Sequence, residues 1–279
     1  QANDVNTLAA NITGAGNFLF TDADDLAVGT VLGTSGIVTA NGNIVLTTTG
    51  NLAVNQPLTD TTNTHLIDLL ANAGNISQTA SGVITGQDLS VQAPAGSALL
   101  DTAANNVTNV EANTLNAFAL NDLGGLTITS IAGGRSTAGI TTAGADITVT
   151  TTGALAVNSN VTTGGTANNT TVELSATGNI TLGADVTGQT VDLSAGGAIT
   201  ATAAGNEIFA QELLMDAVTG IDVNTQVDTI DAHVTGAGNM VIDETGSVIL
   251  TDLDTANGAI TVTATGAVTA TDVQSVTDA

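Results

Sequence analysis

The sequence predicts an all-β protein whose strands wind into a parallel β-helix, or β-solenoid, of about eleven coils. Three observations support this fold class. Segments of the chain repeat at two scales, apolar residues alternate with Thr in short stretches separated by Gly or Asn, and the 279 residues include four Phe but no Trp and no Tyr. Alternation with a period of two and many β-branched residues favour strands over helices. An interior with so few rings must be narrow and filled by aliphatic side chains.

The longer repeat predicts the domain organisation. The segment VNTLAANITGAGN at 5–17 returns as VDTIDAHVTGAGN at 227–239, and a more divergent copy, NNVTNVEAN, contains Val107. A second block, IVLTTTGNLAVN, returns as ITVTTTGALAVN. The long repeats therefore start near residues 5, 107 and 227. We expect residues 1–279 to form a single continuous solenoid segment, a slice of a longer protein.

A shorter period lies inside the long repeat and defines the coils. Two short strands with a Gly- or Asn-bearing turn between them recur, so that the leading apolar residues of successive units are 19 to 29 positions apart. Units of this size cannot bury an apolar face alone and must stack on copies of themselves. Stacked parallel strands add about 4.8 Å per coil. The leading residues are near positions 18, 44, 67, 89, 118, 147, 172, 191, 213, 240 and 260.

The alternation also predicts which side chains face inward. Each buried aliphatic side chain contributes on the order of 1.5–3 kcal/mol, and the Thr residues between them, as in TVT at 148–150, face outward. Gly and Asn are expected at the turns because they tolerate a positive φ. The stretch EIFAQELLMD at 207–216 has some helical spacing and could form one short helix. The predicted inward pairs are Ile44/Leu46, Leu52/Val54, Ile147/Val149, Val172/Leu174, Ile180/Leu182, Val191/Leu193 and Ile260/Val262.

The charge balance excludes several kinds of partner. The chain has 26 acidic residues and a single basic one, Arg135, for a formal net charge of −25. Phosphate binding needs clustered Lys and Arg, so nucleic acid is excluded, and an anionic membrane surface is disfavoured for the same reason. No apolar run approaches the 18 residues typical of a spanning helix, so we expect no membrane insertion. The absence of Cys excludes disulfides and thiolate metal sites.

Two histidines are the first candidates for chemistry. His65 lies close in sequence to Asp60 and Asp68, but no Ser or Cys nucleophile pattern accompanies it. His233 stands where the matching repeat has Asn11, so a general base there would belong to one copy only. Both are interpreted as surface histidines rather than catalytic groups.

The remaining candidates are one cation and one acidic turn. Arg135, in the loop AGGRSTAG, is the sole group that could steady a substrate carboxylate in a lyase, whereas a hydrolase would need paired carboxylates. Asp22, Asp24 and Asp25 in TDADD could offer oxygens to Ca²⁺, but their spacing fits no EF-hand or calcium β-roll motif, and a solvated acidic turn is the preferred interpretation. We therefore assign no catalytic, cofactor-binding or metal residue, expect no cofactor, and expect calcium to act only as a weak, non-specific counterion.

The blocks NDVNTLAANITGAGNFLFTDADDLAVGTV and GNIVLTTTGNLAVN resemble the repeats of large bacterial secreted exoproteins of the filamentous-haemagglutinin type. The resemblance covers nearly the whole chain. It implies a right-handed parallel β-helix, export to the cell surface or the extracellular space, and a role in adhesion, surface fibres or biofilm matrix. The secretion module at the amino terminus of such proteins is not visible in this sequence.

The sequence and the resemblance together predict a non-enzymatic structural rod of a bacterial adhesin or fibre. The expected partners are neighbouring repeats or copies of the chain end to end, together with receptors or glycans on host or bacterial surfaces. Three alternatives stay open at this point: a β-helical carbohydrate-active enzyme, an ice-binding face of Thr-x-Thr rows, and a string of β-sandwich adhesin modules of about 100 residues.

Overall fold

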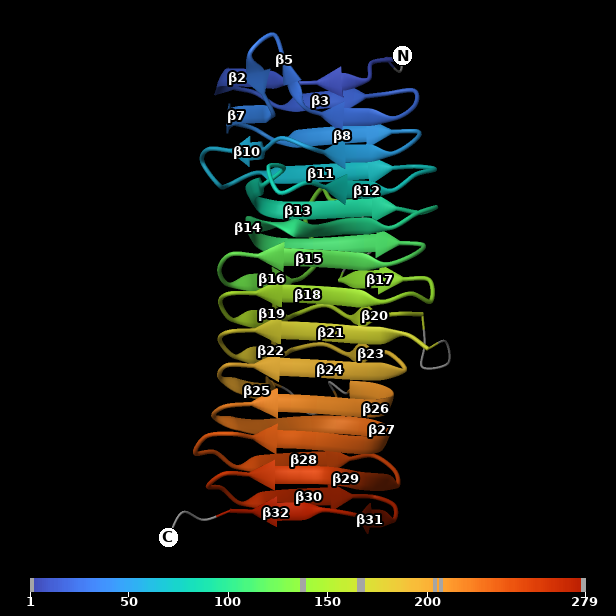
Figure 1. Ribbon diagram of the computed structural model, residues 1–279, viewed down its shortest axis with the longest axis vertical. Helices are drawn as coiled ribbons and strands as arrows, with labels where there is room; N and C mark the ends of the chain where they lie inside the picture. Colours follow the sequence, from blue (N-terminus) through green and yellow to red (C-terminus); the bar gives the residue numbers. More distant parts are fainter. Residues whose placement is uncertain (1–2, 136–138, 165–168, 203–204, 206–207, 277–279) are drawn as a thin grey trace. The chain divides into compact units, whose positions relative to one another are not determined.

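The computed structural model describes residues 3–135, 139–164, 169–202, 205 and 208–276. Within these ranges the chain is all-β, with no helix, and its parallel strands stack as a β-solenoid of about 12 turns, close to the predicted eleven (Figure 1). The described residues accordingly contain no helix long and apolar enough to cross a membrane. The chain forms two compact units, 1–143 and 144–279.

The strands of each unit follow one another in chain order. In the first unit they are β1 (Thr7–Leu8), β2 (Ala10–Ala15), β3 (Phe18–Thr21), β4 (Leu26–Val28), β5 (Thr30–Val31), β6 (Thr34–Ser35), β7 (Ile37–Asn41), β8 (Ile44–Thr48), β9 (Leu52–Val54), β10 (Leu58–Asp60), β11 (Leu66–Ala71), β12 (Ile76–Gln78), β13 (Ile84–Ala93), β14 (Ala98–Thr114), β15 (Phe118–Asp122), β16 (Leu126–Ile128) and β17 (Ile140–Thr142). In the second unit they are β18 (Ile147–Thr151), β19 (Leu155–Val157), β20 (Val161–Thr162), β21 (Thr171–Ala176), β22 (Ile180–Leu182), β23 (Val186–Thr187), β24 (Thr190–Ala195), β25 (Ala198–Ala201), β26 (Ile208–Ala217), β27 (Gly220–Val234), β28 (Met240–Glu244), β29 (Val248–Thr255), β30 (Ile260–Ala264), β31 (Val268–Ala270) and β32 (Val273–Ser275).

Three parallel columns of strands form the walls of the first unit. One column stacks β3, β8, β11 and the second half of β13. Another stacks β4, β9, β12 and the start of β14, and a third stacks β2, β7, β10 and the start of β13. Equivalent residues lie over one another, as Phe18, Ile44 and Ile67 do. The antiparallel hairpin β5–β6 stands outside these columns, and parallel pairing of this kind excludes the β-sandwich alternative, whose sheets are antiparallel.

The second unit repeats this arrangement. β18, β21, β24 and the second half of β26 stack in one column, and β19, β22, β25 and the start of β27 stack in the next. The predicted inward pairs are buried in both units except Ile260 and Val262, which are half-buried: among the described strands, β30 pairs with β28 and has no later strand stacked on it.

The leading residues of successive units do not all lie in one column, because the succession breaks at two places. Phe118 stacks on Ala98 rather than continuing the column of Leu89, and Met240 stacks on Ile221 rather than on Leu213. In both cases a long strand, β14 or β27, runs through all three columns, and the Asn residues inside it, such as Asn105 in β14 and Asn224 in β27, do not end the strand. The pattern of Gly and Asn therefore does not reveal the coil boundary.

The suggested helix within 207–216 is also wrong. Residues Ile208–Ala217 form strand β26, which pairs in parallel with both β24 and β27. Alternate residues of β26, such as Leu213 and Met215, are buried. Pairing on two sides therefore overrides the weak helical spacing of this segment.

Some turn residues have the predicted positive φ, such as Gly124, Gly246 and Asn63, but other Gly–Asn corners have a different physical basis. At the corner Gly74–Asn75 neither residue has a positive φ. A Cβ on Gly74 would lie 2.5 Å from the carbonyl carbon of Gly50 and 2.6 Å from the nitrogen of Asn51, in the coil before. The Asn side chains form a ladder, because Asn75 N–H donates to Asn51 Oδ1 and Ser97 N–H donates to Asn75 Oδ1, each at 2.9 Å. These corners thus require Gly, because there is no room for a Cβ, followed by Asn, because its side-chain oxygen accepts a hydrogen bond from a backbone amide of the next coil.

We expect Gly74→Ala to lower the free energy of unfolding by about 1–3 kcal/mol, because the added methyl group would meet the backbone of the preceding coil. Gly14→Ala is the matched control, since a Cβ at Gly14 has nothing within 4 Å. Urea unfolding followed by circular dichroism measures both. Equal midpoints for the two variants would show that the close approach at Gly74 is not a constraint.

The three long repeats share a buried carboxylate that the spacing alone did not reveal. Val5 N–H donates to Asp22 Oδ1 at 3.2 Å, Val107 N–H to Asp122 Oδ1 at 2.9 Å, and Val227 N–H to Glu244 Oε2 at 3.3 Å. All three acids are buried. Each carboxylate therefore accepts a hydrogen bond from the backbone amide of the residue at which its long repeat begins. The long repeat in the sequence thus corresponds to a repeated contact in the structure.

Burial raises the pKa of Asp122 to about 6, although the hydrogen bond from the amide of Val107 acts in the opposite direction. An unfolded Asp has a pKa of about 3.9. The folded chain therefore binds this proton more tightly than the unfolded chain does. The resulting stabilisation is complete below about pH 4 and is lost as the pH rises through about 6.

Replacing Asp122 by Asn should remove this pH-dependent component. We expect the free energy of unfolding of the parent chain, minus that of Asp122→Asn, to decrease between pH 4.5 and pH 7. Urea titrations of both proteins at several pH values test this expectation. Parallel curves across that range would contradict it.

Candidate functional site

The single arginine is held by a loop that covers the outside of the first unit. Residues 129–135 follow β16 and interrupt a column of strands, which resumes at β17: Val110 in β14 pairs with Ile128, and Ala112 with Ile140. Ile131 and the outward-facing Leu66 are buried. As a result β11 is buried on both faces, unlike most strands of the unit.

Arg135 makes a compact set of contacts on this face. Its Nε donates to Asp68 Oδ2 at 2.5 Å and its Nη2 to Thr47 Oγ1 at 3.0 Å. Its backbone is held as well, since Arg135 N–H donates to Ser90 Oγ at 3.1 Å and Gln92 Nε2 donates to Arg135 O at 2.5 Å. The guanidinium is therefore hydrogen-bonded to side chains of the strands beneath it.

Two buried carboxylates lie under the same loop. Glu111 is fully buried and accepts hydrogen bonds from Ser90 Oγ and from Ile131 N–H, both at 3.0 Å. Burial raises the pKa of Asp68, and the charge of Glu111 raises it further, whereas the hydrogen bond and the charge of Arg135 lower it. The arginine thus acts as the counter-charge that keeps this loop on an acidic face.

The other candidates of the first unit do not join this cluster. His65 Nδ1 lies 3.1 Å from Asp60 Oδ2 and 2.9 Å from Thr64 Oγ1. Asp60 is buried, which by itself raises its pKa, but hydrogen bonds from Thr64, Thr62 and His65 lower the pKa below its ordinary value. Asp60 and His65 therefore stabilise the turn after β10.

The acidic turn at 22–25 does not gather its oxygens around one point. Asp22 is buried on the amide of Val5, while Asp25 Oδ1 accepts from Asn51 N–H at 2.6 Å, in the next coil. Asp24 is exposed, and its pKa is raised by a hydrogen bond with Asp22 and by neighbouring acidic charges. The side chains of Asp22 and Asp25 thus make hydrogen bonds to the backbone around this turn, rather than pointing to a common centre.

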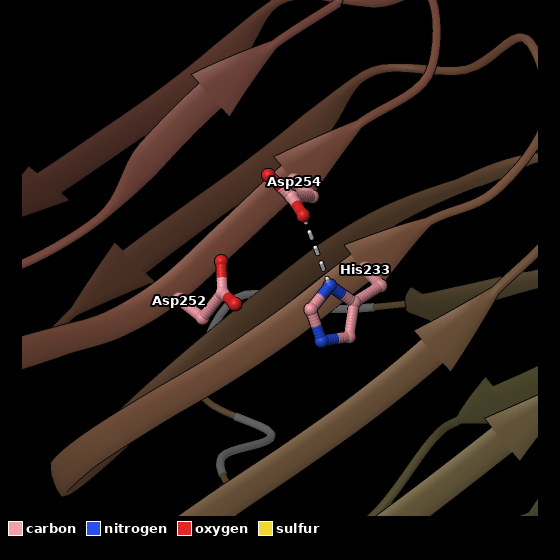
Figure 2. A group of neighbouring side chains, drawn as sticks. All are labelled: His233, Asp252 and Asp254. Atoms are coloured by element: carbon pink, nitrogen blue, oxygen red, sulfur yellow. Dashed lines mark ion pairs between the residues drawn. The ribbon is translucent and has the colours of Figure 1, made fainter.

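The second unit brings together a group that sequence reasoning missed. His233 in β27 lies beside Asp252 and Asp254 in β29, and one potential ligand atom of each lies within 4.8 Å of the others (Figure 2). His233 pairs with Asp254 in the parallel register, and Asp231 pairs with Asp252. Within the described ranges this is the one group of three or more such side chains close enough to hold a metal ion.

The surroundings of this group are acidic and accessible. Partial burial and the charge of Asp254 raise the pKa of Asp252, and Asp272 and Asp231 add to this effect, whereas His233 opposes it. An open pocket lies alongside, lined by Asp216, His233, Asp254 and Val276 among others. The signal in the sequence was DAH at 231–233 followed, one coil later, by DLD at 252–254.

These arrangements differ in what they can do chemically. Arg135, the sole basic residue of the chain, is paired, and the two histidines belong to different units. The group around His233 combines one imidazole with two carboxylates, which is a ligand set suited to a metal ion. Comparison of the chain with protein-family models, with curated proteins and with solved structures gave no match.

We expect Arg135→Gln to lower the free energy of unfolding by about 1–3 kcal/mol, because Asp68 stays buried without its counter-charge. Adding Asp68→Asn to this variant should restore part of the loss. A double-mutant cycle measured by urea unfolding gives the coupling. Strictly additive effects would show that the pair does not hold the loop in place.

Proposed function

We propose that the chain is the structural repeat region of a bacterial secreted surface adhesin or extracellular fibre, in which stacked coils form a stiff rod. The observation that carries this proposal is the parallel ladder within each unit, where every coil is hydrogen-bonded to its neighbour and equivalent residues lie over one another. Such a ladder resists bending and stretching because displacement of one coil breaks many bonds at once. The proposed partners are neighbouring repeats and surface receptors or glycans.

The surface charge of the chain supports the proposed role as a separate, extended rod. A net charge of −25 with one basic residue keeps like rods apart and soluble. The single cation is paired with Asp68, which leaves it poorly placed to bind an acidic polysaccharide. This observation favours the rod over the carbohydrate-active enzyme.

Display of the chain on the surface of a non-adherent bacterium tests the proposal. We expect faster sedimentation of the cells, or binding to glycan-coated surfaces. Leu174→Asp should abolish the effect, since Leu174 is fully buried between Val149 and Leu193 and an unpaired buried charge unstacks the coil. Glu173→Gln is the matched control, because the neighbouring side chain faces solvent.

Two results would contradict the proposed function. One is unchanged sedimentation and binding by cells that display the folded chain. The other is release of reducing or unsaturated sugar from an acidic polysaccharide by the purified protein, which would support the enzyme instead.

A further inference from the structure

We infer that His233, Asp252 and Asp254 form a binding site for one divalent transition-metal ion, with Zn²⁺ as the best-matched occupant, on the outer face of the second unit. The inference does not depend on the proposed function. Inward-facing residues of the same strands, such as Ala232 and Leu253, are fully buried, whereas these three side chains are half-buried and point outward.

The orientation of the His233 ring points to a cation. His233 Nε2 lies 2.9 Å from Asp231 Oδ1, so the tautomer with its hydrogen on Nε2 donates to that carboxylate. In the neutral imidazole this leaves Nδ1 with a lone pair. Nδ1 faces Asp254 Oδ2 at 3.7 Å, and Figure 2 shows this ion pair with the carboxylate of Asp252 beside the ring. A proton, a metal ion or a water molecule between such electron-rich atoms relieves their repulsion.

Asp231 has the role that an outer carboxylate has in many metal sites. A metal-bound histidine usually donates its second ring N–H to a carboxylate or a carbonyl, which fixes the tautomer and the ring orientation. Here the donor and acceptor are already in place at hydrogen-bond distance. Asp231 is thus a positioning residue, not a ligand.

The two ligand carboxylates also have unused oxygen atoms. Asp252 Oδ1 and Asp254 Oδ1 are buried and have no hydrogen-bond partner among the described residues. An acceptor in this condition costs free energy unless something satisfies it. A bound cation, or water molecules completing its coordination, would do so.

The ligand types favour zinc over calcium or magnesium. Ca²⁺ takes six to eight oxygen ligands and Mg²⁺ prefers oxygen in octahedral geometry, whereas imidazole with carboxylates suits Zn²⁺. Tetrahedral Zn²⁺ with bonds of about 2.0–2.1 Å places its ligand atoms roughly 3.3 Å apart. The present atoms lie within 4.8 Å of one another, and rotation about the soft terminal torsions of the two Asp side chains closes the difference. Water completes the fourth position.

Such an ion would join two successive coils. His233 belongs to β27 and both carboxylates belong to β29, which is the next strand in the column. Because only the folded chain brings these ligands together, the metal should stabilise the fold by mass action.

Zn²⁺ itself is the probe for the first experiment. The chain has only two histidines and no Cys, so a sample with labelled histidine rings gives two sets of NMR signals, assigned with His65→Asn and His233→Asn. We expect one equivalent of Zn²⁺ to shift the His233 ring signals, chiefly at Nδ1, and to leave those of His65 in place. Equal shifts at both rings, or a shift only at large excess, would overturn the inference.

Calorimetric titration of variants then identifies the ligands. His233→Asn, Asp252→Asn and Asp254→Asn should each weaken Zn²⁺ binding by at least the roughly 10–100-fold cost of losing an outer-shell partner. Asp243→Asn, an exposed acid on β28 outside the group, is the matched control for charge and should retain binding. Circular dichroism confirms that each variant is folded.

Two further outcomes would refute a specific site. If Asp243→Asn weakens binding as much as Asp254→Asn does, the acidic surface binds Zn²⁺ as a diffuse counterion. If a modest excess of Ca²⁺ displaces Zn²⁺, the imidazole contributes nothing. Retention of Zn²⁺ under these conditions supports the assigned ligands.

Discussion

The parallel register between successive coils is the constraint on which the rest of this structure depends. A strand such as β11 is hydrogen-bonded to β8 on one side and to β13 on the other, so its residues cannot shift without breaking two ladders. A shift by one residue would also turn every inward side chain outward. The register therefore decides which side chains are buried, where the corner glycines must be, and which outward side chains become neighbours.

Much of the coil architecture could be predicted because the alternation of apolar residues in the sequence matches the inward-facing positions that this register sets. The pairs Ile44/Leu46 and Val172/Leu174 are buried as the period of two requires. The boundaries at Phe118 and Met240 could not be placed, since β14 and β27 run through three columns as single strands although each contains Asn. The turn glycines were predicted, and several have the expected positive φ, but the sequence does not show how closely the preceding coil approaches at corners such as Gly74.

The clusters of polar side chains were harder to predict for a related physical reason. Arg135 and Asp68 are 67 residues apart, and they meet because the loop at 129–135 folds back over earlier coils, which no local pattern specifies. His233 and Asp254 are separated by one coil. Their contact follows from the register, but the misplaced boundary at Met240 hid it. In both cases the sequence shows which residues have side chains suited to ion pairing or metal binding, but it does not show which of them lie close together in the fold.

The hairpin β5–β6 shows how this fold can change without losing its register. The chain leaves the coil after Val28 and returns at Ile37, and these two residues still pair with Leu8 and Ala10. The tip residue Leu32 is exposed. An excursion at a corner is thus decoupled from the walls, so evolution or an engineer can graft foreign peptides there as side branches. The corner between β4 and β7 is in this sense an attachment point on the solenoid.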